Sequence, residues 1–190
     1  MNRLFLIAAP VFVMFGIVIG CDALAKDDAN AQKKVAVATV TESKAAATQP
    51  TWGNAAGTVT FTDAGNKRVK VAYHLKGLKP GPHGFHIHEK GDLSAPDLSS
   101  AGAHFNPTGH KHQGPDGKER HAGDLGNVEA DKSGEAKGSV TVDGLSIGTG
   151  AADDIVGKSI IVHANADDLK TDPSGNSGGR VGGGVIELKQ

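Results

Sequence analysis

Short runs of apolar and β-branched residues that alternate with polar ones fill most of the chain after residue 34. The period of two is typical of a strand with one buried face, and no run has the longer period of an amphipathic helix. Turn-forming residues at 63–66 and 131–134 favour hairpins between the runs beside them. The runs lie at 35–41, 57–62, 68–75, 83–89, 125–130, 136–142, 158–163 and 180–188. The pattern predicts an all-β antiparallel Greek-key sandwich or flattened barrel of about eight strands, with two long functional loops.

Two segments, residues 91–123 and 164–179, interrupt this pattern because they have no sustained apolar period. Structureless loops of this length in a compact domain are uncommon and usually functional. Most of the nine histidines lie in these segments or beside them. Because histidine is the most frequent metal ligand among side chains, the sequence indicates a metal site.

Charge and composition narrow the function classes further. The chain has 20 basic and 21 acidic residues, a balance that gives no indication of a nucleic-acid partner. It has 27 glycines and few aromatic residues, which fits a turn-rich β-fold better than a helical bundle.

The N-terminus has the pattern of an export signal. Arg3 is followed by the apolar run 4–20 and then by Cys21, the single cysteine of the chain. Residues 18–21 resemble the lipobox of bacterial lipoproteins. We therefore expect a signal peptide at 1–20, a flexible tether at 21–33 that starts from lipidated Cys21, and an exported domain at 34–190. The domain would lie on the periplasmic or another extracytoplasmic face of a membrane; the alternative, an uncleaved signal anchor, also exports it.

His86 and His88 lie two residues apart, so both imidazoles project from one face of the predicted strand. The spacing suits one metal ion, although two partly buried strand histidines with ordinary hydrogen bonds would give the same pattern. The complete set of candidate ligands is His86, His88, His104, His112, His121, Asp124 and His163.

The candidates divide into two groups by residue type. Three histidines and one aspartate suit tetrahedral zinc, a description that fits His104, His112, His121 and Asp124. The other three histidines form an all-imidazole set from strand ends, and imidazole suits copper as well as zinc. Spacing alone leaves the two metals unassigned. We interpret the remaining histidines as surface, packing or loop-orienting residues; these are His74, His83 and His110.

Several segments, in order and with the same spacing, resemble the copper,zinc superoxide dismutase family from about residue 35 to the C-terminus. They are residues 84–92, 101–107, 123–128, 162–169 and 175–180. The resemblance implies an enzyme that converts superoxide to oxygen and hydrogen peroxide by a copper redox cycle, with a structural zinc. It implies copper on His86, His88, His104 and His163. It implies zinc on His104, His112, His121 and Asp124.

The resemblance also implies roles for three further features. His104 would bridge the two metals, Asp167 would orient one histidine of each site, and Arg180 would attract and dock the superoxide anion. Storage or delivery of copper or zinc without turnover is an alternative function, and a purely structural sandwich is another. A storage module needs neither a bridge nor an anion-docking arginine, so these residues favour the enzyme. The sequence leaves open whether the protein forms a homodimer.

The chain departs from the family at the intrachain disulfide, because Leu98 and Gly183 occupy the two matching positions. Such a bridge would stabilise the fold by about 2–4 kcal/mol. We hypothesise that Leu98 packs apolar surface beneath the loop instead and that bound metal supplies the remaining stability.

Overall fold

The computed structural model describes residues 33–49 and 51–190. The predictions for residues 1–32 lie outside this range; they concern the signal peptide, the lipidation of Cys21 and nearly all of the tether. Within the described ranges, no helix is long and apolar enough to cross a membrane.

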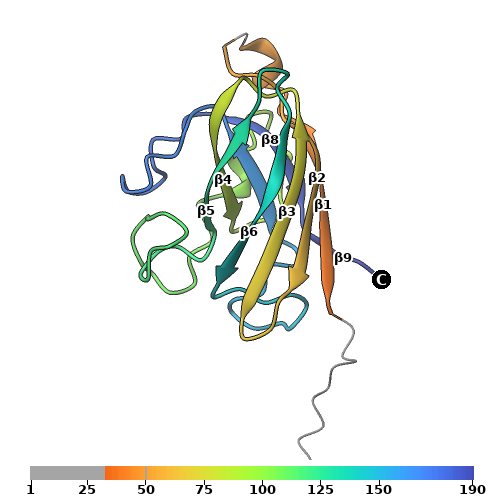
Figure 1. Cartoon of the computed structure of the whole chain (residues 1–190), viewed down its shortest axis with the longest axis vertical. Coiled ribbons are helices and arrows are strands. Elements are labelled where there is room, and N and C mark those ends of the chain that lie inside the picture. The colour runs from red at the N-terminus through yellow and green to blue at the C-terminus, as the bar shows by residue number, and fades with distance from the viewer. Residues whose placement is uncertain (1–32, 50) are drawn as a thin grey trace, which may run out of the picture. The chain divides into compact units, whose positions relative to one another are not determined.

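The described residues form nine β-strands and two short 3₁₀ turns (Figure 1), which confirms the predicted all-β class. The strands are β1 (Val35–Glu42), β2 (Ala56–Asp63), β3 (Arg68–Lys76), β4 (Gly81–His88), β5 (Asp124–Ala130), β6 (Ala136–Asp143), β7 (Ser159–His163), β8 (Arg180–Val185) and β9 (Glu187–Leu188). The 3₁₀ turns are η1 (Ala46–Thr48) and η2 (Ser99–Ala101).

The strands follow the order β5-β4-β7-β8-β1-β2-β3-β6, and the neighbouring pairs are antiparallel. β3 and β4 are consecutive in the chain but lie in different parts of the sheet, since β3 pairs with β6 and β4 pairs with β7. These crossovers are the Greek-key connections that the sequence predicts. The curled sheet brings β5 and β6, at its two ends, close to each other in a nearly closed barrel.

Two details of the predicted strands are wrong. The turn at 131–134 forms, with a hydrogen bond from Asp131 N to Glu135 O (2.9 Å), but it does not join a hairpin. β5 pairs instead with β4, and β6 with β3, so the turn spans the open seam of the barrel. The last run is interrupted at buried Ile186: β8 pairs with β7 and with the end of β1, whereas the two-residue β9 pairs with the beginning of β1.

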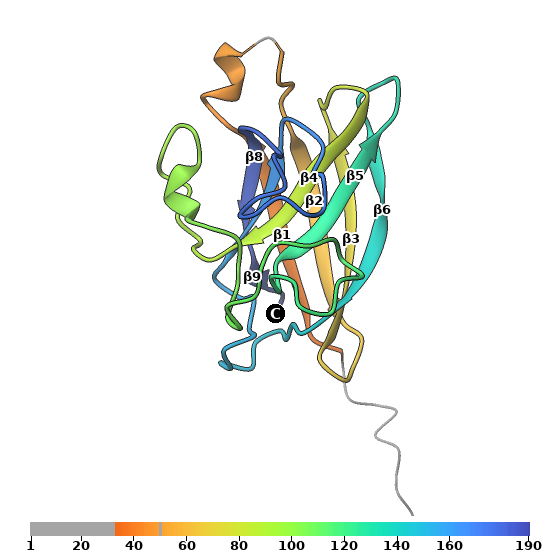
Figure 2. The ribbon, with the colours of Figure 1, turned by 90° about the vertical axis from the view of Figure 1, so that its left-hand side faces the viewer.

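β4 and β7 carry buried residues on both faces, unlike β1 and β3, in which buried residues alternate with more exposed ones. Phe85 and Ile87 of β4 belong to the main apolar core, so the alternate residues His86 and His88 point to the other face. Two loops cover that side: the first long loop (residues 89–123) and the second long loop (residues 164–179). Figures 1 and 2 show both loops on the side of the barrel formed by β4 and β5. The largest fully buried apolar side chains are Phe61, Phe85, Leu75, Ile87, Leu145, Ile147, Ile155, Ile160, Ile161 and Ile186.

Candidate metal centre

The structure brings the seven candidate ligands together in two groups that share His104. Each group contains four ligand atoms within 4.8 Å of one another, and all seven residues are buried. The first group is His86, His88, His104 and His163. The second group is His104, His112, His121 and Asp124.

Backbone pairing positions His104 beside the β4 histidines. His88 and His104 form an isolated antiparallel bridge, and Phe105 N donates to Ile87 O (2.8 Å). The first long loop returns to the same residue of β4 at its other end, where Ile87 N donates to the carbonyl of Gly123 (2.9 Å). Both ends of the segment that carries the loop histidines are therefore fixed to β4.

In the first group, each strand histidine uses one ring nitrogen for an outward hydrogen bond. His86 Nε2 lies 2.8 Å from Asp167 Oδ2, His88 Nδ1 lies 2.9 Å from Gly102 O, and His163 Nδ1 lies 3.2 Å from Gly178 O. The other ring nitrogens face inward, where His88 Nε2 and His163 Nε2 are 3.4 Å apart. Among the described residues, the buried His86 Nδ1 and His104 Nε2 have no hydrogen-bond partner. Inward lone pairs that lack a donor suit a cation such as copper.

In the second group, the ligands converge on one carboxylate oxygen. Asp124 Oδ1 lies 2.8 Å from His104 Nδ1, 3.1 Å from His112 Nδ1 and 3.2 Å from His121 Nδ1. His112 Nδ1 is close to this oxygen but is not aligned for a hydrogen bond with any described residue. Asp124 Oδ2 accepts from the backbone N–H groups of Gln113 (3.2 Å) and His121 (3.1 Å), which orient the carboxylate. Three imidazoles and one carboxylate at these distances fit zinc.

Asp167 connects the two groups from outside. Its side chain is completely buried, and its second oxygen, Oδ1, lies 2.9 Å from His112 Nε2. The side chain of Asn127 holds the Asp167 backbone through two hydrogen bonds. Its Oδ1 accepts from the Asp167 N–H (2.8 Å), and its Nδ2 donates to the Asp167 carbonyl (2.9 Å). Gly175 has φ +63°, and a Cβ at this position would lie 1.8 Å from Asp167 Oδ1. The close approach of the second long loop therefore requires glycine here.

Burial and neighbouring charges favour different protonation states in the two groups. Burial lowers the pKa values of His86 and His88 well below the usual range, and neighbouring imidazoles lower them further. Burial also lowers the pKa of His163 to about 3. These rings are neutral at physiological pH, which is the state that binds a metal.

The second group behaves differently because of its carboxylates. Burial lowers the pKa of His112, but contacts with Asp124 and Asp167 outweigh this effect and raise it to about 10. Burial raises the pKa of Asp124, but contacts with His104 and His112 outweigh it and hold this pKa well below its usual range. A proton therefore resides on His112 in the metal-free protein, and a cation bound between these groups would replace it.

Arg180 begins β8 and its half-buried side chain reaches the first long loop. Its guanidinium donates to the carbonyls of Leu98 and Gly102, the second over 2.7 Å. The Gly102 carbonyl also accepts the hydrogen bond from His88 Nδ1. One backbone carbonyl thus orients both a candidate copper ligand and the candidate anion-docking arginine.

The other histidines lie outside the two groups, as the sequence indicates. His74 pairs with Glu135, and His110 Nδ1 lies 3.1 Å from Thr108 Oγ1. His83 is buried, with its ring nitrogens close to the carbonyls of His163 (2.7 Å) and Lys79 (2.9 Å), so it does orient backbone.

Sequence reasoning missed three contributors to the site: the Gly102 carbonyl, Asn127 and Arg120, whose guanidinium contacts the backbone of His121. Asn127 and Gly102 lie in the segments of family resemblance, which is the signal that could have identified them. Arg120 directly precedes a candidate ligand, but the sequence contains no sign that its side chain turns back to the loop.

Comparisons with known proteins agree with this geometry. A family model described as copper/zinc superoxide dismutase (SODC) matches residues 55–186. The chain is 47% identical over 141 residues to a Cu-Zn superoxide dismutase of Paramecium bursaria Chlorella virus 1, with 70% of this chain and 73% of the viral protein covered. It is also similar to the solved structure titled "Crystal Structure Analysis of the clock protein EA4", with a TM-score of 0.71 and 36% identity. That similarity covers 83% of this chain and 96% of the other.

Proposed function

Because the chain belongs to the copper/zinc superoxide dismutase family, with superoxide as substrate and copper and zinc as metals, we propose how its residues perform the dismutation. Copper is held by His86, His88, His104 and His163. Zinc is held by His104, His112, His121 and Asp124. The observation that carries the proposal is that two buried four-residue groups of different chemistry share His104.

Bound copper supplies the one-electron chemistry by which one superoxide is oxidised to oxygen and a second is reduced to hydrogen peroxide. His104 presents Nδ1 to the zinc-side carboxylate and Nε2 to the copper-side histidines. Nε2 can therefore hold one of the two protons that the reduction of the second superoxide to hydrogen peroxide consumes, and solvent water supplies the other. Asp167 keeps His86 and His112 in orientation by accepting from both rings, so the two sites keep their relative position during turnover.

Arg180 attracts and docks the substrate anion in this proposal. Its guanidinium donates to two backbone carbonyls. Among the described residues, no carboxylate lies within ion-pair distance of it, so the positive charge remains available to an anion. A cation fixed beside a buried site raises the local concentration of superoxide and its rate of encounter.

The test is the dismutation rate of the purified protein loaded with one copper and one zinc. We expect kcat/KM near the diffusion ceiling of about 10⁸–10⁹ M⁻¹s⁻¹, falling as salt rises. Arg180→Met should lower kcat/KM about tenfold and weaken its salt dependence while both metals stay bound. Lys132→Met, at the exposed turn between β5 and β6, is the matched control and should change neither value. Tight binding of both metals with negligible turnover would instead support metal storage.

We also propose that the domain is exported and anchored to a membrane by a lipid on Cys21, on the periplasmic or another extracytoplasmic face. The support is the sequence pattern of residues 1–21. Cys21→Ser should move the protein from the membrane fraction to the soluble fraction or leave it as an unprocessed precursor. Ala23→Ser, two residues later, should remain in the membrane fraction. Equal fractionation of the two variants, with both processed to the same mature length, would contradict the lipid anchor.

A further inference from the structure

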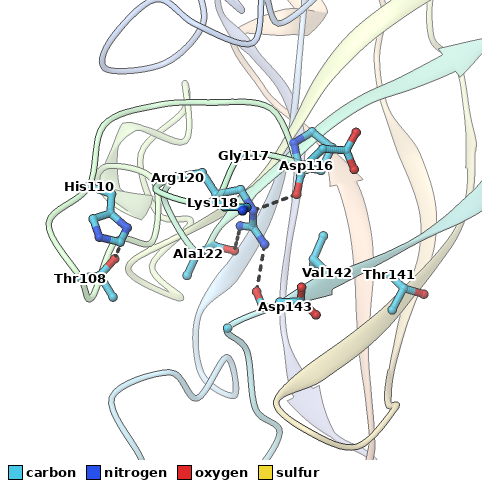
Figure 3. Close-up of a pocket in the computed structure, with 12 residues that line it drawn as sticks. Thr108, His110, Asp116, Gly117, Lys118, Arg120, Ala122, Thr141, Val142 and Asp143 are labelled. Carbon is cyan, nitrogen blue, oxygen red and sulfur yellow. Dashed lines mark hydrogen bonds between the residues drawn. The ribbon is translucent and has the colours of Figure 1, made fainter.

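Arg120 is a buried arginine of the first long loop that the dismutation does not use, and only 7% of it is exposed. Figure 3 shows its guanidinium directed at backbone oxygens of the loop and of the end of β6. Nε donates to Pro115 O (3.1 Å), and Nη1 donates to His121 O (2.7 Å) and Ala122 O (3.0 Å). Nη2 donates to Asp143 O (2.9 Å).

Buried charges are normally paired with an opposite charge, because the loss of hydration costs several kcal/mol. Within the described residues, no carboxylate lies within ion-pair distance of Arg120. Asp124, Asp143 and Asp116 act on its charge only from beyond that distance, and the direct contacts are four backbone carbonyls, which use four of the five donors of the planar guanidinium. A buried cation held entirely by backbone carbonyls is a device that fixes the backbone.

The four carbonyls belong to three separate segments of the chain. Pro115 lies where the loop extends outward, His121 and Ala122 lie where it returns, and Asp143 ends β6 on the barrel. A cavity of about 480 Å³ borders this region and is lined by Thr108, His110, Lys118 and Thr141, among others. The loop therefore lacks close side-chain packing on this side, and Arg120 joins it here to the end of β6 through the Asp143 carbonyl.

His121 is the ligand that this connection fixes most directly. Its carbonyl accepts from Arg120, and its N–H donates to Asp124 Oδ2 (3.1 Å). The same carbonyl accepts from Asp124 N (3.1 Å), so the backbone of one candidate zinc ligand is coupled to the carboxylate of another. The candidate copper ligands other than the shared His104 lie on β4 and β7, and Arg120 makes no hydrogen bond to any of the four.

We propose that Arg120 is a positioning residue for zinc, which sets the zinc affinity by holding His121 in its binding position before the metal arrives. The inference rests on the zinc assignment of the proposed function. It predicts a loss that falls mainly on zinc, because Arg120 binds the backbone of His121, which is a ligand of the zinc group only, whereas the shared His104 is fixed by its own bridge to His88.

The experiment measures zinc and copper affinities by competition with chelators and the absorption spectrum of cobalt bound in place of zinc. Arg120→Met keeps much of the side-chain volume but removes every donor. It should weaken zinc binding about 10–100-fold, as the loss of an outer partner of a ligand typically does. Copper affinity should change less than about threefold, and the cobalt bands should shift from those of a regular tetrahedral site.

Arg120→Lys separates positioning from charge. A lysine keeps the positive charge but donates from a single nitrogen, which cannot reach carbonyls spread around a planar fork. Zinc affinity should therefore remain reduced at least about tenfold in Arg120→Lys. Recovery of the wild-type zinc affinity in this variant would overturn the proposal.

Two control variants isolate the effect. Lys118→Met removes an exposed cation at the same cavity and should leave zinc affinity unchanged. Leu75→Ala destabilises the buried core on β3, a strand that contributes no candidate ligand, and should lower the melting temperature without a selective loss of zinc. Unchanged zinc affinity in Arg120→Met, or a loss no greater than in Leu75→Ala, would overturn the role of Arg120 alone. Failure of the wild-type protein to bind zinc would overturn the zinc assignment as well.

Discussion

At the scale of single residues, Asp167 is the outer contact with the widest effect, because its two oxygens accept from His86 and His112. Asp167→Asn leaves one acceptor and turns an N–H₂ group toward one ring N–H. We expect both metals to bind about 10–100-fold more weakly. Asp168→Asn, at the neighbouring half-buried carboxylate that binds Thr171, is the control and should retain both affinities. A loss of only one metal in chelator competition would contradict the bridging role of Asp167.

His163 gives a prediction for pH, because burial lowers its pKa from 6.5 to about 3. The unfolded chain binds this proton between those values and the folded chain does not, so acid favours unfolding. The metal-free protein should lose up to a few kcal/mol of stability from this group as pH falls from about 6.5 to 3. His163→Gln should lose less stability over the same range, as measured by urea unfolding at each pH. Parallel pH profiles would contradict the prediction.

The residue scale also shows where sequence reasoning stops. The spacing of His86 and His88 indicates a common face, and residue types separate a zinc-like set from an all-imidazole set. The sharing of His104 comes only from the family resemblance, since it depends on how the first long loop returns to β4. The contacts of Arg120 and Arg180 with carbonyls leave no mark in the sequence, because every residue type has the same carbonyl group.

At the scale of elements, an apolar cluster fastens the first long loop where the family has a disulfide. Leu98 is buried against Ala101 and Ile161, with Leu93 beside them, which confirms the hypothesis that it packs under the loop. A Cβ on Gly183 would lie 2.8 Å from Ile161 Cδ1 and 3.1 Å from Leu98 Cδ1. The side chains of Ile161 and Leu98 therefore fill the space beside this glycine.

Leu98→Ala should lower the free energy of unfolding of the metal-free protein by about 2–4 kcal/mol, because it opens a cavity beneath η2. It should also displace the Leu98 carbonyl to which Arg180 donates, so that Arg180 is held less firmly. The fractional decrease in kcat/KM should therefore be larger than the fractional decrease in bound metal. Leu188→Ala, at a side chain that is 44% exposed, should change stability by less than about 1 kcal/mol. Equal unfolding midpoints for the two variants in urea would contradict the role of the cluster.

Strands were predictable at this scale, but their partners were less so. The alternation of β1 and the turn residues after β2 identify local structure correctly, and β2 does pair with β3. The turn between β5 and β6 has equally good chemistry, yet those strands pair elsewhere. A turn motif predicts only that the chain reverses direction, whereas the curl of the whole sheet decides which strands become neighbours.

At the scale of the whole molecule, the metals would add side-chain links between parts that backbone pairing already holds side by side. The ends of β4 and β7, the start of β5 and the first long loop all contribute buried nitrogen or oxygen atoms to the two groups. Buried polar atoms that lack partners cost stability, and a bound cation removes that cost. The absence of a domain cysteine makes this contribution more important, since no disulfide can constrain the loop.

Loading both metals should therefore raise the melting temperature substantially. At a thousandfold excess over Kd, each bound metal adds about 4 kcal/mol, or roughly 10 °C for a domain of this size. Calorimetry before and after chelation measures the shift, and hydrogen exchange locates it. New protection should concentrate between residues 104 and 123, the part of the first long loop that carries the candidate ligands His104, His112 and His121, rather than in β2 and β3. A uniform gain in protection across the barrel would show that the metals stabilise the fold globally and do not act by fastening this loop.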